Sequence, residues 1–307
     1  MTSIINKLCW RNDSPLSDYG NDNKMLRIIA ISSWFLLLAA QVIMIFIFNG
    51  EQVSDSKGYL LYATELVKNN GWYPSTENLT NQYIFGNGYV NFMILIMHFT
   101  SDLRVLYIFN IIFCQIILFA SLNIINRLSD NRRIAYFYII LFCFLNTFWS
   151  EVVSLRTELP FTALVFSAFA VLCSEKKYRI IISGLLIGLG NWVRPLGIPF
   201  MIGAIVFLIV TESKCKEIIK LLFTYIFVLI LIGTCTYFNC GHFIYQPTTL
   251  GVNRIMSANG DANGSFMDRA YIKSIDDMDT ENMIYKDYDE YYIKKSLKWI
   301  KENPSRY

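Results

Sequence analysis

Seven apolar runs constrain the fold of this chain more than any other feature of its sequence. The first, Leu26–Phe48, is longer than the about 20 apolar residues that a helix needs to cross a bilayer. Several of the others are shorter, so we expect their helices to extend into the flanking polar residues. They are Val105–Ile125, Ile134–Trp149, Phe161–Cys173, Ile180–Val193, Leu196–Val210 and Ile218–Phe238. The sequence therefore predicts an all-α polytopic membrane protein.

Composition and charge exclude other classes. Of the 307 residues, 54% are hydrophobic and only 17% are charged, whereas soluble domains carry about a quarter charged residues. The 27 basic and 24 acidic residues leave a formal charge of only +3, which argues against nucleic acid as a partner. Cys235 and Cys240 are the only close pair among the seven cysteines, and no His stands at zinc-ligand spacing from them. We predict neither a disulfide nor structural zinc.

Basic residues predict how the runs are oriented. Lys and Arg form four clusters, around Lys24, Arg132, Lys177 and Lys216, and such clusters mark cytoplasmic loops. If all four are cytoplasmic, the chain crosses the membrane an even number of times between neighbouring clusters. The half-length run Tyr89–Phe99 is then a helix at the outer interface rather than a span. The prediction is seven spans with a cytoplasmic N-terminus, in a bacterial plasma membrane.

This topology divides the chain into three parts. Residues 1–25 form a cytoplasmic tail, and residues 26–238 form the transmembrane module, whose long outer segment is Asn49–Arg104. Residues 239–307 form an external polar segment. Within it, Tyr288–Lys301 has its lysines on one side, which is typical of a helix on a membrane surface or against a bundle.

Asp55 is the first candidate for chemistry in the outer segments. If a helix begins near it, Asp55, Tyr59 and Tyr62 share one face. A carboxylate beside two phenols suits a general base acting on a hydroxyl, or a metal ligand with hydrogen-bonding neighbours. The alternative is an ordinary helix N-cap supplied by Ser54 or Asp55.

Two further outer segments carry charges between apolar helices. Ser150–Pro160 holds Glu151, Arg156 and Glu158; Glu158 can also be read as a residue that complements a helix dipole. Arg194 stands between two apolar runs, on the side that the orientation rule disfavours for cations. It is expected to face an anionic partner such as a phosphate, or otherwise to extend to the lipid headgroups.

The order of these motifs resembles the GT-C superfamily of membrane glycosyltransferases, in particular the bacterial family 39-like enzymes and related mannosyltransferases. The resemblance covers roughly residues 26–305 and rests on order and topological side rather than on any single motif. The ending Trp299–Pro304 resembles a surface helix that precedes further spans, so we expect a fragment or a shortened member. The motifs are Asp55-x-x-x-Tyr59, Gly71-Trp72-Tyr73-Pro74, Thr157-Glu158-Leu159-Pro160-Phe161, Gly184-Leu185-Leu186-Ile187-Gly188-Leu189 and Arg194-Pro195.

The resemblance implies an enzyme that uses a polyprenyl-phosphate sugar donor on the outer face of the membrane. It implies a catalytic role for Asp55 and Glu158, with Tyr59, Arg156 and Arg194 binding substrate. Asp55 would take the proton from an acceptor hydroxyl in a single inverting displacement, and the cations would stabilise the departing lipid phosphate. The acceptor would be a lipid, a glycan of the cell envelope or a protein. Some members bind a divalent metal (Mg or Mn) between acidic residues, here Asp55 and Glu158.

Two other classes remain open from the sequence. A transporter or flippase of a lipid-linked saccharide predicts charges along a path through the membrane and helices broken at its middle. The candidate charges instead gather on one predicted face. A non-enzymatic assembly scaffold accounts for the hydrophobicity but not for the outer Asp, Glu and Arg.

Overall fold

The computed structural model describes residues 24–48, 50–260, 262 and 282–306, and within them the secondary structure is entirely helical. The predicted tail, residues 1–25, lies almost wholly outside these ranges. The larger apolar helices are α2 (Lys24–Ile47), α5 (Arg104–Leu128), α6 (Arg132–Phe144), α8 (Glu158–Leu172), α9 (Arg179–Val193), α10 (Gly197–Val210) and α11 (Cys215–Cys240). The remaining helices are α3 (Asp55–Lys68), η2 (Glu77–Thr80), α4 (Asn87–Met97), α7 (Thr147–Ser150), η3 (Glu151–Val153), α12 (Leu250–Ser257) and α14 (Tyr285–Glu302).

Helix length and composition indicate a membrane protein. Three helices, α2, α5 and α11, are long and apolar enough to cross a bilayer, and the bent pair α6 and α7–η3 would make a fourth. Helices α8 and α9 have 15 residues each, or about 22 Å at 1.5 Å per residue. A bilayer core is about 30 Å thick. Seven full spans are therefore not established by length.

The predicted span Ile134–Trp149 is wrong as a single helix. Helix α6 ends at Phe144, and the chain bends by 60° before α7. Leu145 has an extended backbone, and the Trp149 indole N–H donates to the Cys143 carbonyl at 2.7 Å. The side chain thus satisfies a helix-end carbonyl that the broken helix leaves open, and the polar Asn146 lies at the bend.

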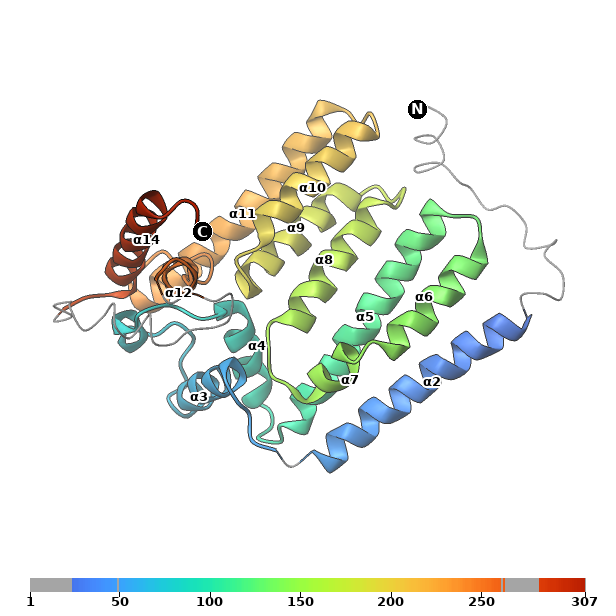
Figure 1. Cartoon of the computed structure of the whole chain (residues 1–307), viewed down its shortest axis with the longest axis horizontal. Coiled ribbons are helices and arrows are strands. Elements are labelled where there is room, and N and C mark those ends of the chain that lie inside the picture. The colour runs from blue at the N-terminus through green and yellow to red at the C-terminus, as the bar shows by residue number, and fades with distance from the viewer. Residues whose placement is uncertain (1–23, 49, 261, 263–281, 307) are drawn as a thin grey trace.

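The apolar helices lie side by side in one row and alternate in direction along the chain (Figure 1). Helices α5 and α8 pack on each other, α8 on α9, and α9 on α11. At one edge of the row, α2, α6, α9 and α11 end while α5, α8 and α10 begin. We call this edge the loop edge. Helices α3, α4, α12 and α14 all lie on its side (Figure 1).

Helix α4 contains most of the run predicted to lie at the outer interface. Its residues Asn87–Ile94 are largely buried, and it packs against α3 and α9. A Cβ on Gly88 would come within 2.8 Å of the Trp192 backbone, so the two helices are in close contact. Helix α4 is thus a core element of the loop edge, and its depth in a membrane stays a prediction.

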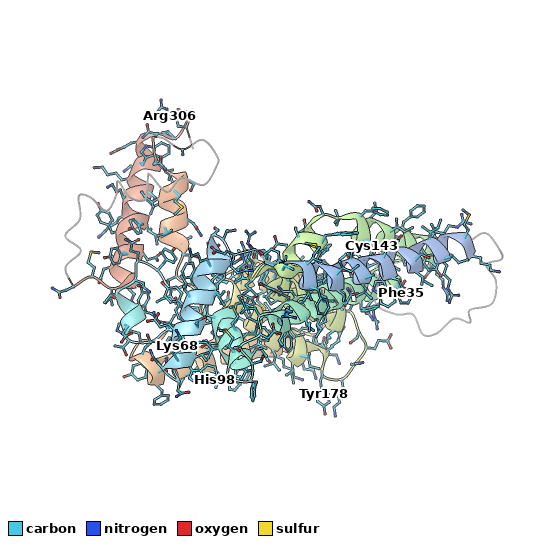
Figure 2. All side chains as sticks on the ribbon, turned by 90° about the horizontal axis from the view of Figure 1, so that it is seen from below. Phe35, Lys68, His98, Cys143, Tyr178 and Arg306 are labelled. Atoms are coloured by element: carbon cyan, nitrogen blue, oxygen red, sulfur yellow. The ribbon has the colours of Figure 1, made fainter. Side chains whose placement is uncertain are left out.

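Helix α14 confirms the expected helix at Tyr288–Lys301. It pairs with α12, and the pair stands away from the row of apolar helices (Figure 2). Tyr288 and Tyr292 are buried against Val252 and Ile255. The apolar face of α14 is therefore partly covered by α12.

Candidate functional site: charged residues at the loop edge

Asp55 is the first residue of α3, as the sequence predicted for a helix beginning there. The N-cap interpretation is not supported, because Ser54 makes no side-chain cap hydrogen bond and Asp55 lies inside the helix. Ser54 has a φ of 53°, a left-handed conformation that is costly for a residue with a side chain. The Asp55 carboxylate stands at the positive end of the helix dipole, and the residue keeps an exposed surface.

Glu158 and Arg194 form a close ion pair. The Arg194 Nη1 lies 2.7 Å from the Glu158 Oε1, and both side chains are partly exposed. Glu158 begins α8, whereas Arg194 follows the last residue of α9. The antiparallel packing of α8 and α9 brings the two residues together across 36 residues of chain.

Arg156 pairs with a second acid. Its Nη1 lies 3.4 Å from the Glu151 Oε1, and only 17% of the Glu151 side chain is exposed. The sequence pointed to Arg156 but did not place Glu151 among the catalytic or binding residues. We call Asp55, Glu151, Arg156, Glu158 and Arg194 the acid–arginine cluster.

Electrostatics couple the members of the cluster. Partial burial of the carboxylate is the main reason why the pKa of Asp55 is raised, and the Glu158 charge raises it further. Arg156 and Arg194 act in the opposite direction and lower this pKa. The structure therefore brings Arg156, Glu158 and Arg194 within electrostatic reach of Asp55, and their roles in a site stay a prediction.

Tyr59 lies beneath the cluster rather than open to solvent. It is only 6% exposed, its ring packs edge-to-face on Phe85 and Tyr89, and its side chain hydrogen-bonds Thr157. Burial and the nearby Asp55 raise the pKa of the Tyr59 hydroxyl. Tyr59 therefore packs α3 against the start of α8, and its role in binding substrate stays a prediction.

Gly86 permits the close approach of three elements under the cluster. A Cβ at this position would lie 2.8 Å from the Thr157 methyl and 2.8 Å from the Val193 carbonyl oxygen. Because the start of α4 fits between Thr157 and Val193, the chain segments that carry Glu158 and Arg194 pack on α4. Nothing in the sequence around Gly86 identified this contact.

Two buried amides hold the loop between η3 and α8. The Asn110 Nδ2 donates to the carbonyls of Val152 and Ser154 at 3.0 and 2.9 Å. The Gln52 side chain binds the backbone of Val153 and Leu155. Neither residue was predicted from the sequence, in which Asn110 is one of three amide side chains inside the apolar run Val105–Ile125.

A metal ion has few ligands at this site. Within the described residues, no group of three or more His, Cys, Asp or Glu side chains could hold one, and the Glu158 Oε1 already pairs with Arg194. Divalent cations such as Mg²⁺ and Ca²⁺ take about six or more oxygen ligands. Asp55 and Glu158 as metal ligands stay a prediction, and we derive no step through a metal.

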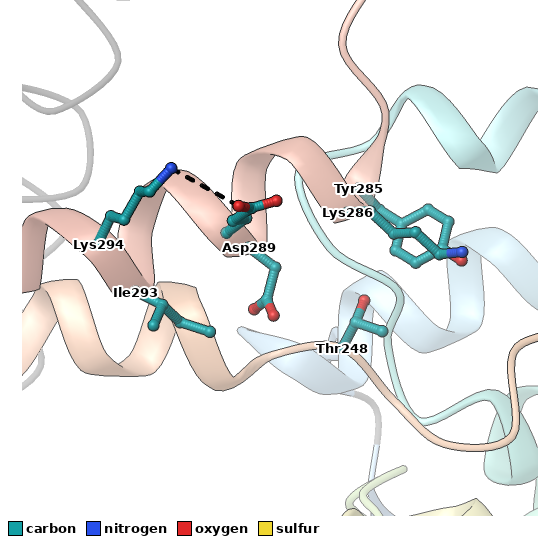
Figure 3. A pocket seen from close by; sticks show the side chains of 7 residues that line it. Thr248, Tyr285, Lys286, Asp289, Ile293 and Lys294 are labelled. Atoms are coloured by element: carbon teal, nitrogen blue, oxygen red, sulfur yellow. Dashed lines mark ion pairs between the residues drawn. The ribbon is translucent and has the colours of Figure 1, made fainter.

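A pocket of about 240 Å³ lies elsewhere, beside the first half of α14 (Figure 3). Its lining includes Thr248, Tyr285 and Asp289, and a 3.7 Å ion pair joins Lys294 to Glu290 there. None of the residues that the sequence proposed as a site lines it.

Comparison with known proteins adds no relative. No protein-family model matches the chain, and no curated protein or solved structure matches it. The functional assignment therefore depends on the chemistry of the acid–arginine cluster and on the resemblance of its motifs.

Proposed function

We propose that the protein is a membrane glycosyltransferase that transfers a sugar from a polyprenyl-phosphate donor to a hydroxyl acceptor at the outer face of the membrane. The supporting observation is the convergence of Asp55, Glu158 and Arg194 at the loop edge from three separate segments. The resemblance to the GT-C superfamily implies a catalytic or substrate-binding role for the same three residues. A carboxylate with a raised pKa beside two guanidinium groups suits proton removal next to a leaving phosphate.

In the proposed reaction, Asp55 accepts the proton of the acceptor hydroxyl while the oxygen of that hydroxyl attacks the anomeric carbon. The bond from that carbon to the phosphate oxygen breaks in the same step, which inverts the anomeric configuration. Arg194 and Arg156 bind the departing phosphate, because guanidinium groups match phosphate geometry. Glu158 holds Arg194 in place through their ion pair.

The same proposal includes the finer topology. The loop edge would face outward, with the N-terminus inside and α8, α9, α10 and the bent pair α6 and α7–η3 crossing the membrane besides α2, α5 and α11. Thinning of the bilayer around the short helices would accommodate their length. The rival reading, a flippase, predicts charges along a path through the membrane, whereas the cluster lies at one edge of the row.

The test is transfer of radiolabelled sugar from polyprenyl-phosphate donors in proteoliposomes. We expect Asp55→Asn to lose about 10²–10⁴-fold in rate, the usual contribution of a general base, with normal expression and insertion. The matched control is Asp102→Asn, since Asp102 is an exposed acid that pairs with Arg104 outside the cluster. An active Asp55→Asn protein would remove the assignment of the base. A folded wild type that transfers no sugar from any donor, but moves lipid-linked saccharide across the bilayer, would instead identify a flippase.

A further inference from the structure

Two buried side chains flank Asp55 and attach its segment to the loop that carries Arg156 and Glu158. Gln52 stands three residues before Asp55 and Ser56 directly follows it. Gln52 is 9% exposed and Ser56 is 1% exposed. Both reach residues 153–155, about 100 positions further along the chain.

Gln52 binds the loop through both atoms of its amide. Its Nε2 donates to the Val153 carbonyl at 3.0 Å and to the Tyr107 hydroxyl at 3.0 Å. Its Oε1 accepts the Leu155 backbone N–H at 3.1 Å. One side chain thus satisfies two backbone groups of the loop. Tyr107 of α5 in turn holds the Gln52 amide in place.

Ser56 adds a contact on the other side of Asp55, where its Oγ lies 3.4 Å from the Ser154 Oγ. Between the two anchors, Ser54 has a φ of 53°. A non-glycine residue keeps such a conformation only where the surrounding structure over-determines it. The two contacts supply that constraint, and the position of Asp55 follows from it.

We infer that Gln52 and Ser56 are positioning residues that fix the Asp55 carboxylate relative to Arg156 and Glu158. This inference rests on the proposed function for its consequence in catalysis, but not for the contacts themselves. A displacement of about 1 Å at a reacting group can cost 10²-fold in rate. We call these contacts of Gln52 and Ser56 with residues 153–155 the clamp. If Asp55 is the base, loss of the clamp therefore lowers the rate of transfer measurably.

The first measurement is hydrogen exchange of the Leu155 amide, which needs no activity. We expect Gln52→Leu to speed its exchange by about tenfold, the equivalent of one net hydrogen bond, while amides within α5 keep their protection. Gln52→Glu preserves the acceptor for Leu155 but loses the N–H donated to Val153, so its effect should be smaller. It also keeps the length of the side chain if Gln52→Leu fails to fold. Unchanged exchange at Leu155 in a folded Gln52→Leu protein would overturn the inference. If that variant does not fold, a Gln52→Glu protein in which both the Leu155 exchange and the transfer rate stay at the wild-type values would overturn it.

The second measurement is the pH profile of sugar transfer. We expect Gln52→Leu to lower kcat by about 10²-fold with little change in KM, and to shift the acidic limb because the charges around Asp55 move. Ser56→Ala should act in the same direction but less strongly. The matched control is Gln41→Leu: Gln41 is completely buried, but its amide binds Phe148 and Cys114 instead of residues 153–155. A loss of rate proportional to the unfolded fraction, with an unchanged pH profile, would reduce Gln52 to a structural role. If the wild type transfers no sugar, the proposed function fails, while the exchange of the Leu155 amide still decides the clamp.

Discussion

The Arg194 guanidinium lies 2.7 Å from the Glu158 carboxylate and joins the end of α9 to the first turn of α8. Both side chains remain partly exposed, so solvent screens their attraction, and a surface pair of this kind contributes little to stability. The proposed function gives this pair a role in binding rather than in stability. Arg194 keeps further N–H donors with which to bind an anion while it is paired to Glu158.

Exchanging the two charges separates the structural role of this pair from binding. Glu158→Arg combined with Arg194→Glu restores an ion pair and should fold as well as the wild type, as judged by size-exclusion profile and thermal unfolding in detergent. We expect this double variant to lose transfer, because the phosphate would meet a displaced cation. Each single variant serves as a control for folding. A double variant with wild-type rate would show that the pair acts only in structure.

The pH dependence of transfer should move in opposite directions when the two charges are removed singly. A base works in its ionised form, so the rate falls as the pH drops through the raised pKa of Asp55. Glu158 raises this pKa and Arg194 lowers it. Glu158→Gln should therefore move the acidic limb to lower pH, and Arg194→Gln should move it to higher pH. Limbs that stay in place in the residual activity of both variants would mean that another group titrates.

Replacing Asp55 with Asn should raise the stability of the fold at neutral pH, although it abolishes transfer. A carboxyl whose pKa is higher in the folded than in the unfolded protein makes a contribution to stability that is present at low pH and lost as the pH rises through the folded value. At neutral pH, ionised Asp55 therefore destabilises the fold, and Asp55→Asn should unfold at a higher temperature than the wild type. Near pH 3 the difference should vanish. A lower unfolding temperature for Asp55→Asn at pH 7 would contradict this reading.

The sequence predicted the helical class better than the lengths of the helices. Apolar runs and basic clusters define an alternating helical bundle, and four of the five residues of the acid–arginine cluster were selected as charged groups on one predicted face. Helix lengths were harder to predict. A run such as Ile134–Trp149 is mostly apolar, and its break depends on the contact between Trp149 and the backbone of Cys143. Tertiary contacts of this kind leave no periodic signal.

The positioning residues could not be predicted from the sequence either, because their role also depends on tertiary contacts. Gln52 lies in a polar stretch where an amide is unremarkable, and only the fold places it against residues 153–155. The resemblance implies substrate binding for Tyr59, which shares a helix face with Asp55, yet the Tyr59 ring is buried against Tyr89 of α4. Shared faces predict proximity between residues of one helix but not what the rest of the chain places on them.

Asn110 should be needed for the stability of the loop that carries Arg156. Replacing it with Leu keeps the branched shape and number of heavy atoms but leaves the Val152 and Ser154 carbonyls without their amide donor. A buried acceptor without a partner costs about 1–3 kcal/mol, and we expect Asn110→Leu to lower the free energy of unfolding by about that amount. The control is Asn123→Leu on the same helix, where the side chain is exposed and accepts only from Arg127. Equal stability of the two variants in denaturant titrations would argue against a structural role for the Asn110 hydrogen bonds.

Packing between α9 and α11 gives a prediction that is independent of function. A Cβ on Gly188 would lie 2.8 Å from the Val228 Cβ, and one on Gly184 would lie 2.9 Å from the Leu221 carbonyl oxygen. Small residues at this four-residue spacing let membrane helices approach closely. Gly188→Ala should therefore push the helices apart and cost about 1–3 kcal/mol.

Gly190 on the same helix supplies the control for this prediction. A Cβ there meets the nearest atoms of Phe161 and Val165 at 3.6 to 3.7 Å, an ordinary contact distance. Gly190→Ala should be neutral or stabilise the helix by up to about 1 kcal/mol, because alanine loses less backbone entropy than glycine on folding. The measurement is thermal unfolding of the two variants in the same detergent. If Gly188→Ala unfolds at the same temperature as Gly190→Ala, then α9 and α11 do not pack as closely as the structure places them.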